Sequence, residues 1–295
     1  MFFFQLIRWK NLLMIAFLQV LLKFFLIPLF QIPEQLSNSQ FVLLVLATLL
    51  IAAGGYVIND IKDISIDKIN KPDKQVVSKK ISLSNAKIVY YLLSLSGLIM
   101  GAYLSFIKQN VLAFIGFLVP FILLYYYAIR AKKQFLIGNV LVSLLIVFSL
   151  LIVVVFELEL LENNQLVNII FAISLYAFFL NLAREIVKDS EDVIGDKAHG
   201  VQSIPVKYGF KGTAVSVQIC IGILLLFTFA IGLLQYKTQP ALVIYLVTGL
   251  MSGLLLFLSQ LQKATKAADY AKLSILLKLL MVVGIISLLF VKPLI

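Results

Sequence analysis

The chain has 295 residues, of which 62% are hydrophobic, and a formal net charge of +11. Such a composition excludes an ordinary soluble domain, in which about half of the residues are apolar and about a quarter are charged. It also argues against nucleic-acid binding, because the sequence contains no basic soluble domain, and favours loops that attract anionic membrane lipids. The single cysteine, Cys220, excludes an intrachain disulfide.

Apolar runs recur along the whole chain, and each is near the length of about 20 residues that a membrane-spanning helix needs. Strands of a membrane barrel would be shorter and would alternate in polarity, so the runs predict an all-α membrane protein. We expect a single domain over residues 1–295 with about nine transmembrane helices, near residues 12–30, 41–59, 85–106, 110–129, 136–156, 165–184, 212–234, 239–260 and 274–292.

The positive charges fix an expected orientation, because cytoplasmic loops carry an excess of Lys and Arg. Alternate loops hold Arg8 and Lys10, the lysines of residues 62–80, the Arg130 cluster, the cations of residues 184–211, and those of residues 263–272. The opposite side shows only Lys108, Lys237 and Lys292. We therefore expect a cytoplasmic N-terminus and an external C-terminus, in a bacterial or archaeal cell membrane.

The longest polar stretches follow the second and the sixth predicted spans, and both carry the pattern D-x-x-D-x-x-x-D. The first acidic segment, residues 59–84, contains the first triad, and the second acidic segment, residues 184–211, contains the second triad; the triads are Asp60, Asp63, Asp67 and Asp189, Asp192, Asp196. They include six of the eight aspartates in the chain. Carboxylates are costly beside a bilayer, so their recurrence indicates a shared task and an internal repeat.

On a continuous helix, positions i, i+3 and i+7 lie on one face, so each triad is expected to direct three carboxylates the same way. Aimed at each other across a cavity, the triads would bind hard divalent cations and the phosphates that these carry. Asn59 precedes the first triad, and the candidate cations that accompany the two triads are Lys71, Lys74, Arg184 and Lys188. A short inner loop adds Arg130, Lys132 and Lys133, which serve either phosphate binding or topology.

The segments N-D-I-K-D-I-S-I-D (59–67), N-K-P-D-K (70–74) and R-E-I-V-K-D-S-E-D-V-I-G-D (184–196) resemble the signatures of the UbiA superfamily of intramembrane prenyltransferases. Within it, the second segment is similar to that of digeranylgeranylglyceryl phosphate synthases. Lys71 and Lys74 stand where arginines are usual. The resemblance implies nine helices that enclose a cavity open to the cytoplasmic side.

It also implies Mg²⁺-dependent transfer of a prenyl group, here geranylgeranyl, from its diphosphate to a lipid acceptor such as geranylgeranylglyceryl phosphate. Each triad would hold one of two Mg²⁺ ions, and Lys132 and Lys133 would be available for the phosphate of the acceptor. We expect membrane lipids as surroundings and no required protein partner. The alternatives are prenylation of an aromatic quinone precursor and, more distantly, a cation-coupled secondary transporter, whose carboxylates usually lie near the bilayer midplane.

Overall fold

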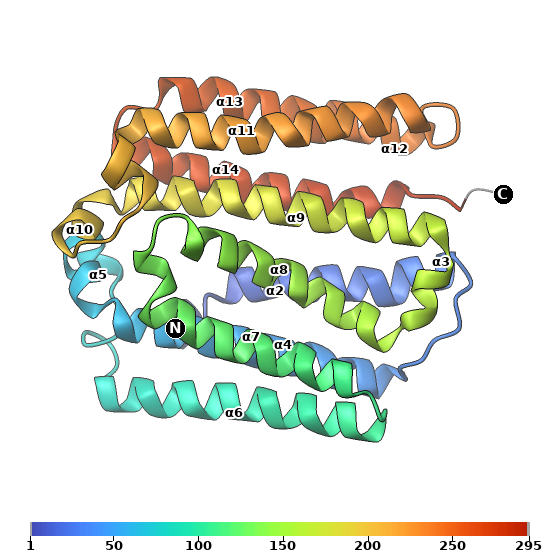
Figure 1. Ribbon diagram of the computed structural model, residues 1–295, viewed down its shortest axis with the longest axis horizontal. Helices are drawn as coiled ribbons and strands as arrows, with labels where there is room; N and C mark the ends of the chain where they lie inside the picture. Colours follow the sequence, from blue (N-terminus) through green and yellow to red (C-terminus); the bar gives the residue numbers. More distant parts are fainter. Residues whose placement is uncertain (1, 294–295) are drawn as a thin grey trace. The chain divides into compact units, whose positions relative to one another are not determined.

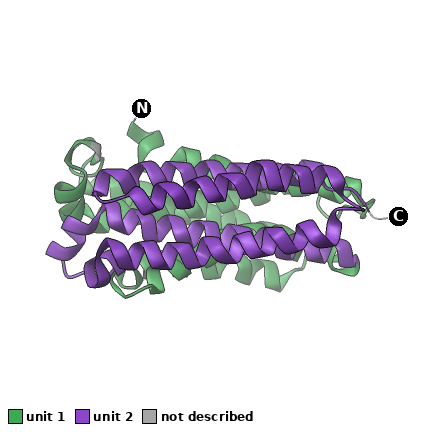
Figure 2. Cartoon of the chain, turned by 90° about the horizontal axis from the view of Figure 1, so that it is seen from above, with its two compact units in different colours: residues 1–162 green, residues 163–295 purple. Residues whose placement is uncertain are grey.

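The computed structural model describes residues 2–293, except for the side chain of Lys74, and the regular elements in this range are helical. The chain forms two compact units, Met1–Glu162 and Asn163–Ile295 (Figure 2). Each unit begins with apolar spans and includes one of the two triads.

The described part of the first unit contains five long helical stretches and several short helices, and Figure 1 shows how they are arranged. Its α-helices are α1 (Phe2–Leu6), α2 (Trp9–Leu21), α3 (Ile27–Leu29), α4 (Asn38–Lys62), α5 (Ile64–Asn70), α6 (Leu83–Ile107), α7 (Val111–Ile129) and α8 (Ile137–Phe156). A π-helical stretch, η1 (Leu22–Leu26), connects α2 with α3, and the short 3-10 helices are η2 (Pro72–Lys74), η3 (Ala131–Lys133) and η4 (Leu158–Glu162).

The second unit contains the helices α9 (Asn164–Glu191), α10 (Val193–Ala198), α11 (Ile204–Gln235), α12 (Pro240–Tyr245), α13 (Ser252–Lys263) and α14 (Ala267–Ile286). A π-helical stretch, η5 (Leu246–Met251), joins α12 to α13, and a 3-10 turn, η6 (Ser287–Phe290), follows α14. Within this unit, α9 packs mainly against α14 and α11.

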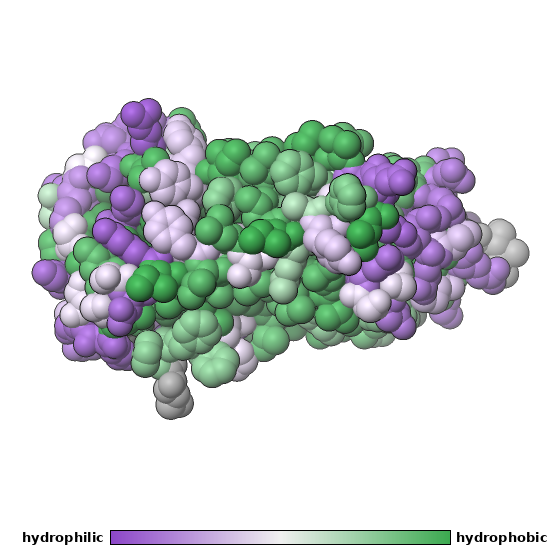
Figure 3. Space-filling model, turned by 90° about the horizontal axis from the view of Figure 1, so that it is seen from below, coloured by the Kyte–Doolittle hydropathy of each residue, from purple (hydrophilic) through white to green (hydrophobic). Residues whose placement is uncertain are grey.

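The prediction of nine spans is confirmed for the part of the chain that the structure describes. Nine helices there are long and apolar enough to cross a membrane: Trp9–Leu29, Asn38–Lys62, Leu83–Ile107, Val111–Ile129, Ile137–Phe156, Asn164–Glu191, Ile204–Gln235, Pro240–Lys263 and Ala267–Phe290. The face in Figure 3 shows hydrophobic side chains over its middle and hydrophilic ones toward its two ends, as a membrane protein requires.

Small residues bring α4 and α6 into close contact in the first unit. A Cβ atom added to Gly97 would lie 2.9 Å from the backbone oxygen of Ala47, and one added to Gly54 would overlap the side chain of Ser94. Membrane helices gain van der Waals contact when small residues let their backbones approach. This packing holds the middle of α4 against α6, and the first triad begins near the end of α4.

A buried ion pair lies at the other end of the same unit. Lys23 and Glu157 are both fully buried, with 2.9 Å between Nζ and Oε1. Lys23 also donates to the backbone oxygen of Leu36 (2.6 Å), and Glu157 accepts from the backbone N–H groups of Gln35 (2.7 Å) and Leu36 (3.1 Å). A charged pair that leaves water needs such additional hydrogen bonds. The pair therefore fastens the loop before α4 to the end of α8.

Candidate active site

The first triad spans a break between two helices. α4 ends at Lys62, Asp63 has φ −95° and ψ 4°, and α5 starts at Ile64. The expectation of one continuous helix through the triad is therefore wrong. Backbone hydrogen bonds still cross the break, from Asp63 N to Asn59 O (2.9 Å) and from Asp67 N to Asp63 O (2.8 Å). The chain thus turns at Asp63, and Asp67 lies on a separate short helix.

Asp60 is bound by an arginine from the start of the first span. Arg8 donates through Nη2 to Oδ1 of Asp60 at 2.9 Å, and its guanidinium carbon lies 5.0 Å from the ring centroid of Tyr56. Asn11 donates to the hydroxyl of the same tyrosine at 3.2 Å. Because Tyr56 and Asp60 are one turn apart on α4, these contacts tie the first span to the first triad.

Asp63 is buried and makes two polar contacts within the first unit. Asn59 donates through Nδ2 to Oδ2 at 2.8 Å, and the ammonium group of Lys132 forms an ion pair with Oδ1. Lys132 lies on η3, in the loop between α7 and α8. The structure therefore brings together three residues of the predicted site: Asn59, Asp63 and Lys132.

The rest of the first acidic segment folds back beside α5. Lys71 follows α5 and is half-buried, whereas the side chain of Lys74 lies outside the described part of the structure. Gln75 is buried and donates through Nε2 to the backbone oxygen of Ile64 at 3.1 Å. Below it, Val76 and Val77 join a core cluster with Val57, Ile58, Ile61 and Leu6. The loop that carries the predicted cations is thus anchored in the unit.

The second triad has the same design. α9 ends at Glu191, Asp192 has φ −99° and ψ 7°, and α10 starts at Val193. Asp196 is buried on α10, and its backbone oxygen accepts from the N–H groups of His199 (3.2 Å) and Val201 (3.0 Å). The chain turns at the middle aspartate here too, so Asp196 lies on a separate short helix.

The two predicted cations of α9 share one carboxylate. Glu185, which is buried, accepts from Nη1 of Arg184 at 2.7 Å through Oε1 and from Nζ of Lys188 at 3.0 Å through Oε2. Glu185 and Lys188 thus form an ion pair at the i, i+3 spacing of one helix face. Arg184 Nε is buried and has no hydrogen-bond partner among the residues that the structure describes, so this guanidinium retains a donor for an anion.

The donor atoms of both segments are of the kind that Mg²⁺ prefers. Mg²⁺ takes oxygen ligands, often one or two carboxylates plus phosphate oxygens and water, rather than a complete cage of protein atoms. Asn59 Oδ1 is buried beside the carboxylate of Asp63 and has no hydrogen-bond partner in the described part of the chain. Among the residues described, no three His, Cys, Asp or Glu side chains form a ready metal cluster. The set fits a metal that is completed by phosphate and water.

From the sequence, Arg8 is only one of the cations that indicate the orientation in the membrane, and neither Tyr56 nor Asn11 is a candidate site residue. A signal was present, because Tyr56 precedes Asp60 by four residues and so lies on the same helix face. No pattern in the sequence indicates that Arg8 contacts Asp60 or that Asn11 contacts Tyr56. Arg130 and Lys133, in contrast, are exposed, whereas the side chain of Lys132 is largely buried.

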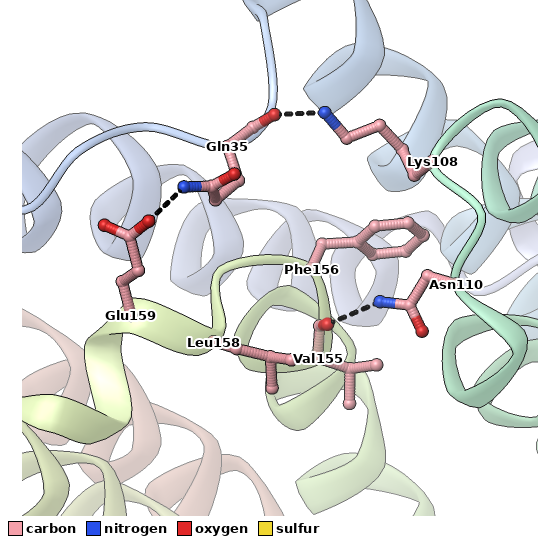
Figure 4. A pocket seen from close by; sticks show the side chains of 7 residues that line it. All are labelled: Gln35, Lys108, Asn110, Val155, Phe156, Leu158 and Glu159. Atoms are coloured by element: carbon pink, nitrogen blue, oxygen red, sulfur yellow. Dashed lines mark hydrogen bonds between the residues drawn. The ribbon is translucent and has the colours of Figure 1, made fainter.

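A pocket of about 290 Å³ lies in the first unit, where Gln35, Lys108 and Glu159 are among the residues that line it (Figure 4). Its lining includes Gln35, whose backbone oxygen accepts from Lys108 and whose side chain donates to Glu159. Gln35 precedes α4 and Asp60 lies near its end, so the length of this helix, about 37 Å, separates them. This pocket is therefore not part of the acidic site.

Comparison with known proteins gives relatives over nearly the whole chain. The sequence pattern of the UbiA prenyltransferase family matches residues 20–294. Digeranylgeranylglyceryl phosphate synthase from Sulfurisphaera tokodaii is 35% identical over 238 residues, which are 79% of this chain and 81% of that protein. The protein of the same name from Sulfolobus acidocaldarius is 36% identical over 234 residues, with the same coverage of both chains.

Solved structures of the same family are similar in fold to this chain over nearly its whole length. A structure of digeranylgeranylglyceryl phosphate synthase is 27% identical, with a TM-score of 0.65, and the match covers 97% of this chain and 96% of the other. A UbiA homologue from Archaeoglobus fulgidus, solved with GPP and Mg²⁺, is 18% identical with a TM-score of 0.63, over 98% of this chain and 99% of the other. The latter supports the fold and shows that this homologue binds Mg²⁺.

Proposed function

The chain belongs to the UbiA prenyltransferase family, and we propose that it transfers a geranylgeranyl group from its diphosphate to geranylgeranylglyceryl phosphate, releasing pyrophosphate. The chain is an integral membrane protein, which suits both substrates because their tails dissolve in a bilayer. One observation carries the proposal: two acidic segments of equal spacing turn at their middle aspartate in the same way. Relatives of similar sequence over most of the chain are named digeranylgeranylglyceryl phosphate synthase, which supports this choice of acceptor.

The first triad and the second triad would each hold one Mg²⁺ ion, directly or through water. When bound, the ions neutralise charge that develops on the diphosphate as the allylic C–O bond breaks. Asp63 and Asp192 occupy the corresponding turns of the two segments, and Asn59 offers a further oxygen beside Asp63. Through the metal that they would hold, these residues would orient the diphosphate and make it a weaker base as it leaves.

Four cations would bind the remaining charge of the diphosphate: Arg184, Lys188, Lys71 and Lys74. Arg184 and Lys188 are held by the buried carboxylate of Glu185, so their head groups are restrained before the substrate arrives. Charge-assisted hydrogen bonds from restrained donors bind an anion at a smaller entropic cost. Lys132 and Lys133, from the loop that follows α7, remain candidates for the phosphate of the acceptor.

The allylic cation is then captured by the hydroxyl of the acceptor, which loses its proton as the new C–O bond forms. Phe-, Leu- and Ile-rich spans would bind the isoprenoid tail and keep water away from the cation. Exclusion of water decides the product, because hydrolysis of the same cation would give a free prenyl alcohol.

The experiment is a transfer assay with purified protein in detergent, Mg²⁺ and radiolabelled geranylgeranyl diphosphate. Geranylgeranylglyceryl phosphate should yield a doubly prenylated lipid and one pyrophosphate for each transfer, and EDTA should stop both. A hydroxybenzoate, a naphthoate and homogentisate serve as competing acceptors. Product with an aromatic acceptor alone would reassign the chain to a quinone pathway, and absence of pyrophosphate release would exclude prenyl transfer.

A further inference from the structure

Asp63 meets a positive charge from elsewhere in the first unit. Its Oδ2 accepts from Asn59 at 2.8 Å, and its Oδ1 pairs with the ammonium of Lys132. The side chains of Asp63 and Lys132 are 12% and 11% exposed. Both oxygens of this carboxylate thus have a protein partner, in surroundings where an ion pair is only partly screened by water.

The backbone of Lys132 is held in place, while its side chain is long and flexible. A Cβ atom added to Gly138 would lie 2.8 Å from the Cα of Lys132, so the start of α8 packs directly on this residue. Ala131, the preceding residue, is fully buried. A fixed backbone brings the ammonium to Asp63, and four rotatable bonds allow it to move away again.

We propose that Lys132 is an internal counterion of Asp63 that a divalent metal must displace. This inference rests on the proposed function, which assigns Asp63 to the metal. A divalent cation and an ammonium group repel each other strongly when they share one partly buried carboxylate. The ion pair therefore stabilises the metal-free protein and lowers its affinity for Mg²⁺. When the metal binds, Lys132 leaves Oδ1 and its charge becomes available for a phosphate.

Arg8 differs from Lys132, although it also contacts a carboxylate of the first triad. Arg8 donates a hydrogen bond to one oxygen of Asp60, and its guanidinium packs on the ring of Tyr56. That tyrosine is bound in turn by Asn11. Because these contacts do not depend on the charge of Asp60 alone, Arg8 stays and orients the carboxylate. Of these two cations, Lys132 is the one that is exchanged for the metal.

The experiment measures metal binding by purified protein without any prenyl diphosphate. Mn²⁺ replaces Mg²⁺, so that free and bound ions can be counted by electron paramagnetic resonance in detergent. Lys132→Met keeps the length of the side chain and removes its charge, so the Kd for Mn²⁺ at the first triad should fall by roughly fivefold. Lys132→Arg keeps the charge and should show an unchanged or higher Kd.

Lys68→Met is the matched control. Lys68 is exposed on α5, directly after Asp67, and its replacement removes the same charge near the triad without removing a partner of Asp63. Its Kd should change by less than about twofold, because exposed charges are screened. An equal decrease of the Kd for Mn²⁺ in Lys68→Met and Lys132→Met would show that any positive charge near the triad has this effect, and would overturn the proposal.

Thermal unfolding gives a second readout that activity does not influence. In EDTA, Lys132→Met should unfold at a lower temperature than the wild type, because Asp63 loses its counterion. With saturating Mg²⁺ the difference in unfolding temperature should disappear, because a ligand that binds the folded state stabilises the variant with the higher affinity more. A deficit that persists equally in EDTA and Mg²⁺ would show that Lys132 is only a structural partner, and would overturn the proposal.

The outcomes separate this inference from the proposed function. If the wild type binds Mn²⁺ and Lys132→Met does not bind it more tightly, the counterion inference fails while the metal site stands. If the wild type binds no divalent cation with or without prenyl diphosphate, both fail together.

Discussion

Asp63 and Asp192 share one backbone conformation, although they lie far apart in the chain and in different compact units. Their φ and ψ angles are −95° and 4° in the first case and −99° and 7° in the second. Each residue ends a long span and precedes a short helix, α5 or α10. The repeat of the sequence is therefore also a repeat of the local structure, because in both segments a long span ends at the middle aspartate and a short helix follows it.

The first prediction concerns these two residues as a pair. Asp63→Asn and Asp192→Asn should each reduce kcat for prenyl transfer by about a hundredfold or more, because each removes a charge that acts in the transition state. The double variant should be scarcely worse than either single variant, since groups that act as a unit are not additive. The measurement is single-turnover transfer in detergent, together with pyrophosphate release.

Glu162→Gln provides a control for the loss of an acidic side chain, because Glu162 is exposed on η4 and outside both acidic segments. It should retain wild-type activity. Raised Mg²⁺ should restore part of the activity of Asp63→Asn if the loss is one of metal affinity. Near-normal turnover in either single aspartate variant would remove its triad from the mechanism.

A second prediction concerns the cations of α9. Lys188→Met should raise the KM for geranylgeranyl diphosphate by roughly tenfold, the value of one charge-assisted hydrogen bond, and change the KM for the acceptor much less. Lys197→Met, on an exposed position of α10, is the matched control. Steady-state kinetics with each substrate varied would decide, and equal changes for both substrates would place Lys188 outside the diphosphate site.

Much of the fold was predictable because the membrane simplifies the problem. Apolar length alone marks a span, and the structure places a long helix at each predicted run. The triads were visible because carboxylates are rare in this chain. Both signals are local in the sequence, and neither depends on how distant segments pack.

The features that could not be predicted from the sequence depend on contacts between distant segments or on local turns of the backbone. Helical periodicity could not reveal the breaks at Asp63 and Asp192, since both adjoining segments are helical and backbone hydrogen bonds cross the break. The partner of Asp60 on the first span and the partner of Asp63 after α7 are long-range pairs. Lys23 gave a partial signal, as a lone charge inside an apolar span, without identifying Glu157.

A third prediction tests the orientation, which follows from the distribution of cations. Reporters inserted after Lys80 and after Lys133 should be active in the cytoplasm, and a reporter fused after Ile295 should be active outside it. Paired alkaline phosphatase and green fluorescent protein fusions measure the two sides independently. A cytoplasmic reporter signal after Ile295 would contradict the predicted topology.

The last prediction concerns the buried pair of Lys23 and Glu157. Lys23→Met should destabilise the protein by about 3–5 kcal/mol, because it leaves a buried carboxylate without its counterion. Adding Glu157→Gln should recover part of this loss, since the amide is neutral and its oxygen still accepts from the backbone of Gln35 and Leu36. Thermal unfolding in detergent measures both, with Lys237→Met, on an exposed residue, as the control for charge.

The order of the three stabilities is the sharp part of this prediction. The stability of the double variant should lie between those of the wild type and Lys23→Met. This order is expected if the unpaired charge of Glu157, and not the loss of packing, destabilises Lys23→Met. Lys23 is fully buried, so methionine replaces most of its apolar stem and isolates the charge effect. A double variant less stable than Lys23→Met would show that the two residues contribute separately, and that the loop before α4 is not fastened by their pairing.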